Sequence, residues 1–346
     1  MDIAKVDKNF HVETKLDKEG LVFYDVTNEP FRVYGVQMDD GCFRRLPESV
    51  ARSVNDGVLG LHANTAGGRV RFATDSPYIA IHAEMHSLGK MPHFPFTASI
   101  GFDLYTGTHY LGTYPPPYDV TDGFEGSVTT HQTGVCEYTV NFPLYSGVTR
   151  LFIGVKEGSV LRRASDYTDD PIVFYGSSIT QGGCASRPGN AYTSIVAREL
   201  GYDHINLGFS GSAKGEDTVA DYIAQLPMSA FVYDYDHNAP NPAHLAATHE
   251  RMFRRIRAAR PNLPILMLTR PQYYLKDEEK ERLAIVRATY ERAIAEGDRN
   301  VYFIPGPELI DPLVREAALV DNCHPNDAGF VSMAKAVTEL LRTVLE

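Results

Sequence analysis

The apolar pattern of this chain changes between Ser165 and Asp170, and the change limits what the chain can fold into. Before it, short stretches alternate apolar and polar residues between clusters of Gly, Pro, Asn and Asp. After it, continuous apolar runs alternate with stretches of helical period. Period-two alternation indicates strands with one buried face, whereas apolar runs joined by helices indicate a parallel sheet covered on both faces. The sequence therefore predicts two domains of different fold class.

Residues 1–165 are predicted to form an all-β sandwich that resembles a jelly roll, because regularly spaced short strands suit two packed sheets. No long window of this domain has a helical period. Its expected strands include residues 69–73, 78–85, 137–142 and 149–155. Residues 114–118 contain three consecutive prolines, which cannot donate to a strand ladder, so this segment is predicted to be a stiff connection.

Residues 170–346 are predicted to form an α/β domain with a parallel sheet. The expected strands are residues 172–175, 204–207, 230–235, 263–269 and 301–304. Residues 190–200 predict an amphipathic helix that Asn190 caps and Gly201 ends. A second helix is predicted from four apolar residues that share a face, Leu245, Met252, Phe253 and Ile256. Ligands of such sheets bind beyond the carboxyl ends of the strands, so functional residues are expected in the loops that follow them.

Composition excludes several partners. The chain has 346 residues, 43% of them hydrophobic, which is enough for two buried cores. A net charge of -11 and a pI near 5.6 argue against nucleic acid or an anionic membrane surface and favour a small neutral substrate. Residues 1–10 lack the apolar core of a signal peptide, and no segment is long and apolar enough to span a membrane. We expect a cytoplasmic protein as given, or a secreted one if a signal was removed; the oligomeric state is not predicted.

Two motifs indicate a serine nucleophile with a histidine base. Ser178 lies at the centre of GSSIT, directly after the first apolar run of the second domain. Asp321 and His324 lie in DNCHP near the C-terminus, three residues apart. A hydroxyl becomes a useful nucleophile when a neighbouring imidazole takes its proton, and a carboxylate behind the imidazole fixes its tautomer. The serine lacks the second glycine of G-x-S-x-G, which indicates a class other than the α/β hydrolases.

The ends of the next two strands supply candidate oxyanion donors. Gly211 ends the run NLGFSG, and it can expose its backbone N–H with no side chain in the way. Asn238 ends the run DHN, and its side-chain amide can donate. Together with the N–H of Ser178, these groups are predicted to form an oxyanion hole.

These four blocks, in this order, resemble the Ser, Gly, Asn and His blocks of the SGNH, or GDSL, hydrolase superfamily. The run GFDLY at residues 101–105 is similar to the GxDLY signature of a β-sandwich domain attached to one SGNH subfamily. The resemblance implies a flavodoxin-like three-layer hydrolase domain behind a β-sandwich. The chain departs from the family pattern at Ser177, Asp236 and Ala239, so the local geometry around the oxyanion pocket is expected to differ from that of the family.

The function predicted from these residues is a serine esterase that hydrolyses short acyl esters, acetyl first, of a carbohydrate or other small polyol. An acyltransferase with the same triad and a binding module on an inactive scaffold are the alternatives. No cofactor or metal is predicted, since the four cysteines lack C-x-x-C spacing and HERMF lacks the second His of H-E-x-x-H. Cys184 and Cys323 are either packing thiols or a disulfide that ties the Ser loop to the His loop.

Three further expectations concern the surroundings of the site. The segments 101–105 or 114–118 of the sandwich are expected to wall the pocket, with the two domains packed rigidly. His82, His86 and His93 are expected to be packing residues of strands and loops. Asp236 and His237 either support the pocket or lie on the surface.

Overall fold

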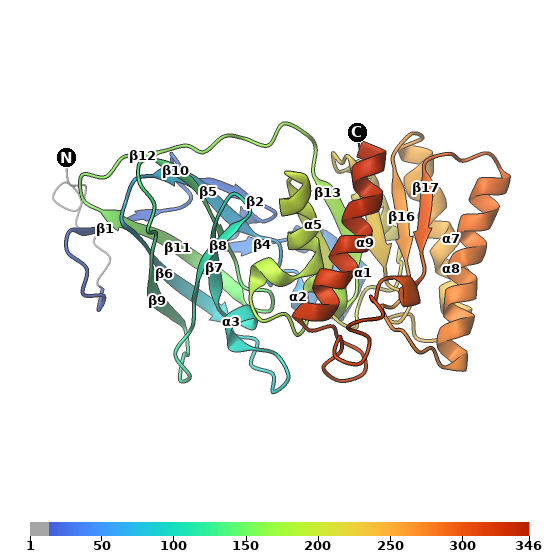
Figure 1. Ribbon diagram of the computed structural model, residues 1–346. Helices are drawn as coiled ribbons and strands as arrows, with labels where there is room; N and C mark the ends of the chain where they lie inside the picture. Colours follow the sequence, from blue (N-terminus) through green and yellow to red (C-terminus); the bar gives the residue numbers. More distant parts are fainter. Residues whose placement is uncertain (1–13, 346) are drawn as a thin grey trace.

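The computed structural model describes residues 14–345, and it divides into an antiparallel β-rich region and a parallel α/β region that lie side by side (Figure 1). This is the predicted fold class. Residues 1–10, on which the expectation about targeting rests, lie outside the described part of the chain.

The β-rich region is a sandwich of two antiparallel sheets whose facing side chains form one core. One sheet has the order β1-β11-β6-β9 and the other β12-β5-β10-β7-β8, with β2 paired to β5. The four strands predicted at residues 69–73, 78–85, 137–142 and 149–155 are confirmed as β5, β6, β10 and β11. The strands are β1 (Leu21–Asp25), β2 (Arg32–Tyr34), β3 (Gln37–Asp39), β4 (Cys42–Arg44), β5 (Arg69–Thr74), β6 (Tyr78–Ser87), β7 (Phe102–Thr106), β8 (His109–Tyr114), β9 (Gly123–Thr129), β10 (Cys136–Asn141), β11 (Gly147–Lys156) and β12 (Leu161–Arg162).

Three short helices interrupt this region, α1 (Glu48–Val54), α2 (Asp56–Leu61) and α3 (Phe96–Ser99). The side chain of Asn55 caps α2 by accepting the N–H of Val58. Ala51 of α1 and Val58 of α2 do not join the sandwich core; they are buried in the core of the parallel sheet instead. The first part of the chain therefore contributes to both cores.

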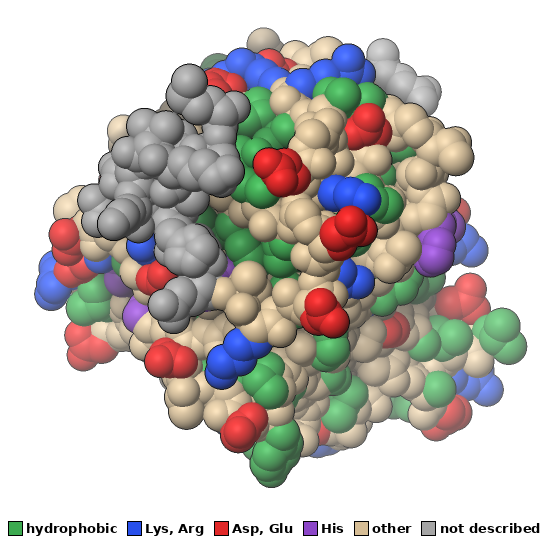
Figure 2. Space-filling model, turned by 90° about the vertical axis from the view of Figure 1, so that its left-hand side faces the viewer, with side chains coloured by type: hydrophobic (Ala, Val, Ile, Leu, Met, Phe, Trp, Pro, Cys, Tyr) green, Lys and Arg blue, Asp and Glu red, His purple; other side chains and the backbone are tan. Residues whose placement is uncertain are grey.

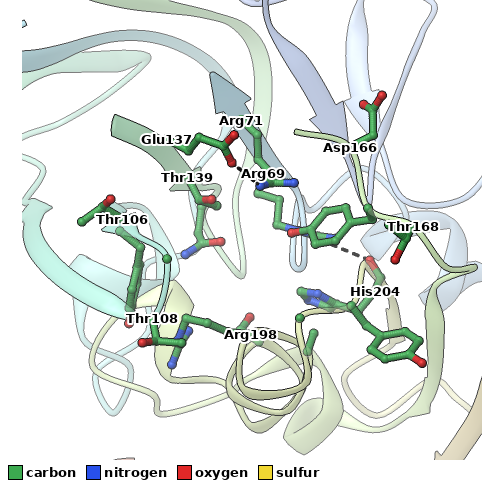
Figure 3. Close-up of a pocket in the computed structure, with 18 residues that line it drawn as sticks. Arg69, Arg71, Thr106, Thr108, Glu137, Thr139, Asp166, Thr168, Arg198 and His204 are labelled. Atoms are coloured by element: carbon green, nitrogen blue, oxygen red, sulfur yellow. Dashed lines mark hydrogen bonds and ion pairs between the residues drawn. The ribbon is translucent and has the colours of Figure 1, made fainter. Parts of the chain in front are cut away.

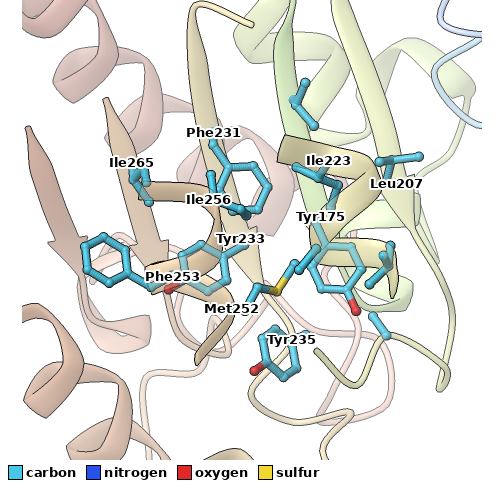
Figure 4. Packing of buried hydrophobic residues seen from close by; sticks show 14 of the residues in the cluster. Tyr175, Leu207, Ile223, Phe231, Tyr233, Tyr235, Met252, Phe253, Ile256 and Ile265 are labelled. Carbon is cyan, nitrogen blue, oxygen red and sulfur yellow. The ribbon is translucent and has the colours of Figure 1, made fainter. Parts of the chain in front are cut away.

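The α/β region has a five-stranded parallel sheet of order β14-β13-β15-β16-β17, the strand order of flavodoxin-like folds. Helices α5 and α9 cover one face, while α6, α7 and α8 cover the other together with α1 and α2. Figure 4 shows the second of these layers, where Tyr175, Phe231 and Tyr233 pack under α6 and α7. The elements are β13 (Ile172–Gly176), α4 (Ser178–Gln181), α5 (Tyr192–Leu200), β14 (His204–Gly208), α6 (Asp217–Gln225), β15 (Ala230–Asp234), α7 (Pro242–Ala259), β16 (Ile265–Leu268), α8 (Asp277–Ala295), β17 (Val301–Ile304) and α9 (Asp327–Leu345).

One predicted helix start is wrong. Asn190 does not cap α5; it ends a short 3₁₀ helix, Pro188–Asn190, and its amide donates to Ser186 Oγ at 3.2 Å. The helix begins at Tyr192 with Ala191 before it, because Pro188 and Gly189 form a separate turn first. Gly201 ends α5 as predicted, in the left-handed conformation at φ 75°.

The surface at the sandwich end carries acidic and basic side chains interspersed with one another (Figure 2). Among the described helices, none combines the length and the apolar character needed to cross a membrane.

Candidate active site

The turn after β13 presents Ser178 at the carboxyl edge of the parallel sheet. Ser177 caps α4 by accepting the N–H of Ile179 at 3.0 Å, and Ser178 is the first residue of that helix. Gly176 and Gly208 are partners in the β13–β14 ladder. A Cβ on Gly176 would lie 1.8 Å from an oxygen of Asp234, so only glycine lets the turn pack this closely.

The structure brings Ser178, His324 and Asp321 into one hydrogen-bonded row. Ser178 Oγ lies 2.8 Å from His324 Nε2, and His324 Nδ1 lies 2.8 Å from Asp321 Oδ2. A carboxylate only accepts, so Nδ1 carries the proton and Nε2 presents its lone pair to the hydroxyl. Ser178 is 5% exposed, and the His324 side chain is 17% exposed, so the pair sits at a sheltered edge that substrate can still reach.

Asp321 is held by its own loop. Burial alone would raise the pKa of Asp321, but hydrogen bonds from the backbone and the ring of His324, and from the N–H of Cys323, lower that pKa below its ordinary value. Asp321 Oδ1 accepts the two backbone N–H groups at 2.8 and 3.1 Å. The carboxylate is therefore fixed before it orients the imidazole.

The two loops predicted to hold oxyanion donors lie next to each other. One hydrogen of the Asn238 amide goes to the carbonyl of Phe209 at 3.0 Å, which joins the loop after β15 to the loop after β14. The amide has a second hydrogen for another acceptor. Gly211 adopts φ +66°, and no heavy atom lies within 4 Å of the position a Cβ would take.

Comparison with known families identifies the second half of the chain. The model described as the GDSL-like lipase/acylhydrolase family matches residues 169–342, which is half of the 346 residues. The chain belongs to this family. A second model, the N-terminus of SGNH-hydrolase-type esterases with the GxDLY signature, matches residues 21–161. The resemblance inferred from the sequence is confirmed, and the protein is a serine esterase of the SGNH/GDSL type.

Solved structures share this fold over nearly the whole chain. A Bacteroides ovatus protein described as a GDSL-like lipase is 26% identical with a TM-score of 0.84, over 94% of this chain and 98% of that one. The salicylyl-acyltransferase SsfX3 from a tetracycline biosynthetic pathway is 20% identical with a TM-score of 0.77, also over 94% and 98%. A family two carbohydrate esterase from Clostridium thermocellum, in complex with cellohexaose, is 14% identical with a TM-score of 0.63, over 91% and 99%. No curated protein sequence matches the chain.

Arg45 ties the sandwich region to the glycine block of this GDSL hydrolase, and nothing in the sequence pattern marks it. The side chain is 3% exposed, and burial lowers its pKa to about 9. Its guanidinium donates to the carbonyls of Gly208 at 2.6 Å and Asn206 at 3.2 Å on β14, and to those of Asn64 and Leu61 on its own side. An arginine from the first region thus holds the end of the strand that leads to Gly211.

Asp234 lies beneath the Ser178 turn and is 1% exposed. It accepts hydrogen bonds from the hydroxyl of Thr180, from Tyr192 at 3.3 Å and from the N–H of Ser177 at 3.4 Å. None of these donors carries a charge, and burial raises the pKa of Asp234 to about 7. The carboxyl group therefore supports α4 in its protonated form below neutral pH.

The sandwich region contacts Ser178 and His324 through Phe94 and Tyr145, which the sequence did not single out. Phe94 packs against His324 at 5.9 Å between ring centroids, and Tyr145 donates to the carbonyl of Ser178 at 3.1 Å. His93, expected to be a packing residue, has its ring 5.9 Å from that of His324. The expected wall segment 101–105 contacts another loop: Asp103 accepts the N–H of Gly189 at 2.8 Å. Residues 93 and 94 take its place beside His324.

Asp236 supports the histidine loop instead of lying on the surface. It is 3% exposed and contacts His237 Nδ1 at 3.1 Å through one oxygen. Its other oxygen accepts the N–H of Arg270, whose guanidinium donates to the carbonyl of Asn322 at 2.7 Å. The asparagine block and the loop of His324 are therefore connected through Arg270.

All four cysteines are free. No disulfide joins Cys184 to Cys323, which leaves the alternative of packing thiols. Burial, with the nearby charge of Asp321, raises the pKa of Cys184 to about 12. The thiol is therefore protonated and is not a nucleophile at neutral pH.

A cavity of about 440 Å³ lies between the sandwich and α5 (Figure 3), and neither Ser178 nor His324 is among the residues that line it. His204, the first residue of β14, lines it with Arg69, Arg71 and Arg198. Ser178 follows the opposite end of the neighbouring strand, so this cavity lies at the amino edge of the sheet. Because parallel sheets bind ligands at the carboxyl edge, we place the candidate active site at Ser178 and not in this cavity.

Proposed function

We propose that the protein hydrolyses short acyl esters, acetyl esters first, of a carbohydrate or another small polyol. Ser178 is the nucleophile, His324 the general base and acid, and Asp321 the group that orients His324. The observation that carries the proposal is the 2.8 Å contact between Ser178 Oγ and His324 Nε2, because a base must reach the proton that it removes.

The reaction proceeds in two acyl-transfer steps. Ser178 Oγ bonds to the ester carbonyl carbon while its proton moves to His324 Nε2; the C–O bond then breaks, and His324 returns the proton to the leaving alcohol. Water next attacks the acyl-enzyme, gives a proton to His324, and releases the acid and the free serine. The N–H groups of Ser178 and Gly211 and the free amide hydrogen of Asn238 are the donors for the oxyanion.

The proposal of a short acyl group rests on the side chains that pack behind Ser178. Phe94 and Tyr145 are each 6% exposed, and their rings are 4.7 Å apart. A Cβ on Gly183 would lie 2.9 Å from Phe94 and 3.0 Å from Tyr145, so this wall is already closely packed. A long acyl chain would need space that these rings fill. The polyol part of the proposal rests on likeness to the carbohydrate esterase described above.

The test is hydrolysis of a panel of esters from acetyl to octanoyl, including acetylated sugars. Acetyl esters should turn over fastest, and Ser178→Ala and His324→Ala should each lower kcat by about 10⁴-fold or more while the circular dichroism spectrum stays that of the wild type. Ser212→Ala, a hydroxyl on a neighbouring loop that donates to Ser210, is the matched control and should retain activity. Substantial turnover by either triad variant would remove the assignment.

An acyltransferase is the second candidate, favoured by likeness to the salicylyl-acyltransferase at a TM-score of 0.77. Both reactions pass through the same acyl-enzyme and differ only in the nucleophile that resolves it. Product analysis with an alcohol acceptor competing against water separates them: a transferase gives mostly the new ester at millimolar acceptor. An inactive binding module is disfavoured because Ser178, His324 and Asp321 are all present and in contact.

A further inference from the structure

Three potential metal ligands from distant parts of the chain meet beside the triad. A ring nitrogen of His93, the thiol of Cys184 and a ring nitrogen of His324 all lie within 4.8 Å of one another. His93 comes from the sandwich region, Cys184 from the loop after α4, and His324 from the loop before α9. Ligand atoms around a tetrahedral zinc are about 3.3 to 3.8 Å apart at the usual bond lengths, so small side-chain shifts complete the set.

The contact that makes His324 a base also makes it a metal ligand. Asp321 accepts the Nδ1 proton at 2.8 Å, which leaves the Nε2 lone pair free to accept. Zinc sites use the same arrangement, in which a carboxylate fixes the tautomer and raises the basicity of a ligating histidine. The lone pair that receives the proton of Ser178 is therefore the one that a cation would bind.

The other two ligands are held in place by the fold. Cys184 is 5% exposed, and its backbone adopts φ 72°, a conformation uncommon for a residue other than glycine. His93 packs on Phe94 with ring centroids 4.4 Å apart, which directs it toward His324 from the exposed side. Two imidazoles and one thiolate are a borderline-soft set that suits zinc and excludes calcium and magnesium.

We propose that His93, Cys184 and His324 bind a thiophilic divalent cation, zinc in the first place, and that the bound metal reversibly stops ester hydrolysis. The cation displaces Ser178 from Nε2 of His324 and takes up the thiol as thiolate, with its proton released to solvent. Because one ligand comes from the sandwich region, the metal also links the two regions of the chain. The proposed metal binding rests on the positions of the three side chains, whereas the proposed inhibition also rests on the proposed function.

Binding is tested without activity, on the full-length protein with cadmium as the probe. Wild type should show one ultraviolet thiolate-to-cadmium charge-transfer band per chain, and Cys184→Ser should abolish it. Cys136→Ser, which removes a thiol on β10 of the sandwich, is the matched control and should keep the band. A band that survives Cys184→Ser, or no band in the wild type, overturns the site.

Inhibition is tested by zinc titration of acetyl-ester hydrolysis and its reversal by EDTA. Removing a side chain that only hydrogen-bonds to a metal ligand already costs about 10- to 100-fold in metal affinity. Removing a ligand itself should cost at least as much, so His93→Gln and Cys184→Ser should each raise the zinc inhibition constant at least about 10-fold. Equal inhibition of wild type and both variants refutes the proposal. Ser178→Ala keeps all three ligands and should still give the cadmium band; if that variant also retained hydrolysis, the proposed function would fail while the metal site stood.

Discussion

Replacing Asp234 by Asn should stabilise the protein increasingly as the pH rises. The folded carboxyl has a pKa of about 7 against an ordinary 3.8, because it is buried among uncharged donors. Between these two pH values the unfolded chain releases the proton and the folded chain keeps it, so each pH unit costs the wild type about 1.4 kcal/mol. The protonated carboxyl of Asp234 makes its full contribution to the free energy of unfolding below about pH 3.8, and this contribution is lost by about pH 7. Asparagine resembles the protonated carboxyl and does not titrate. The variant therefore keeps the free energy of unfolding that the wild type loses, which amounts to about 4 kcal/mol.

The assay is urea unfolding of wild type and Asp234→Asn at several pH values between about 5 and 8. The stability advantage of the variant should grow from about 2 kcal/mol at pH 5 to about 4 kcal/mol at pH 7 and then stay constant. Titrating groups that do not interact with Asp234 contribute equally to both proteins and cancel. Asp119→Asn changes an exposed carboxylate and serves as the matched control. A difference between wild type and Asp234→Asn that does not vary with pH, or that favours the wild type as pH rises, refutes the reasoning.

Three further predictions address the turn, the triad and the contact between regions. Gly208→Ala places a Cβ 2.2 Å from the backbone nitrogen of Gln181; α4 must move, so we expect a loss of about 1–3 kcal/mol in urea unfolding together with reduced kcat. Asp321→Asn should lower kcat about 10²–10⁴-fold at nearly constant KM in steady-state kinetics, because an amide favours the wrong tautomer of His324; an unchanged kcat contradicts this role. Asp103→Ala removes the acceptor of a buried N–H and should cost about 1–3 kcal/mol, whereas Asp119→Asn should cost nothing measurable.

The loops that carry the candidate site residues could be predicted because the topology of a parallel sheet collects such loops at one edge. Ser178, Gly211 and Asn238 each follow a strand, and the carboxyl ends of parallel strands meet at one edge. Local sequence patterns therefore located loops that are far apart in the chain. His324 lies outside the strands, and only its spacing from Asp321 marked it.

The features that the sequence did not predict depend mainly on how the sandwich region packs against the hydrolase sheet. Helices α1 and α2 have 7 and 6 residues, fewer than two turns each, so they leave no measurable period. His93 reaches His324 because the sandwich packs against the hydrolase sheet in one orientation, which no local pattern encodes. The misplaced start of α5 has a local cause: Asn190 is a good cap by residue type, but the Pro188–Asn190 turn uses it first.

The contribution of residues 45–61 to the second core has a consequence for how such enzymes can diversify. A recombinant that joins the first half of one relative to the second half of another would place a foreign guanidinium against β14 and foreign helices against α6. To exchange substrate preference by gene shuffling and keep a folded enzyme, residues 45–61 must come from the same parent as the hydrolase half. They are encoded more than a hundred positions upstream of that half. Breakpoints chosen at the apparent junction near Ser165 would separate Arg45 from the strand it braces.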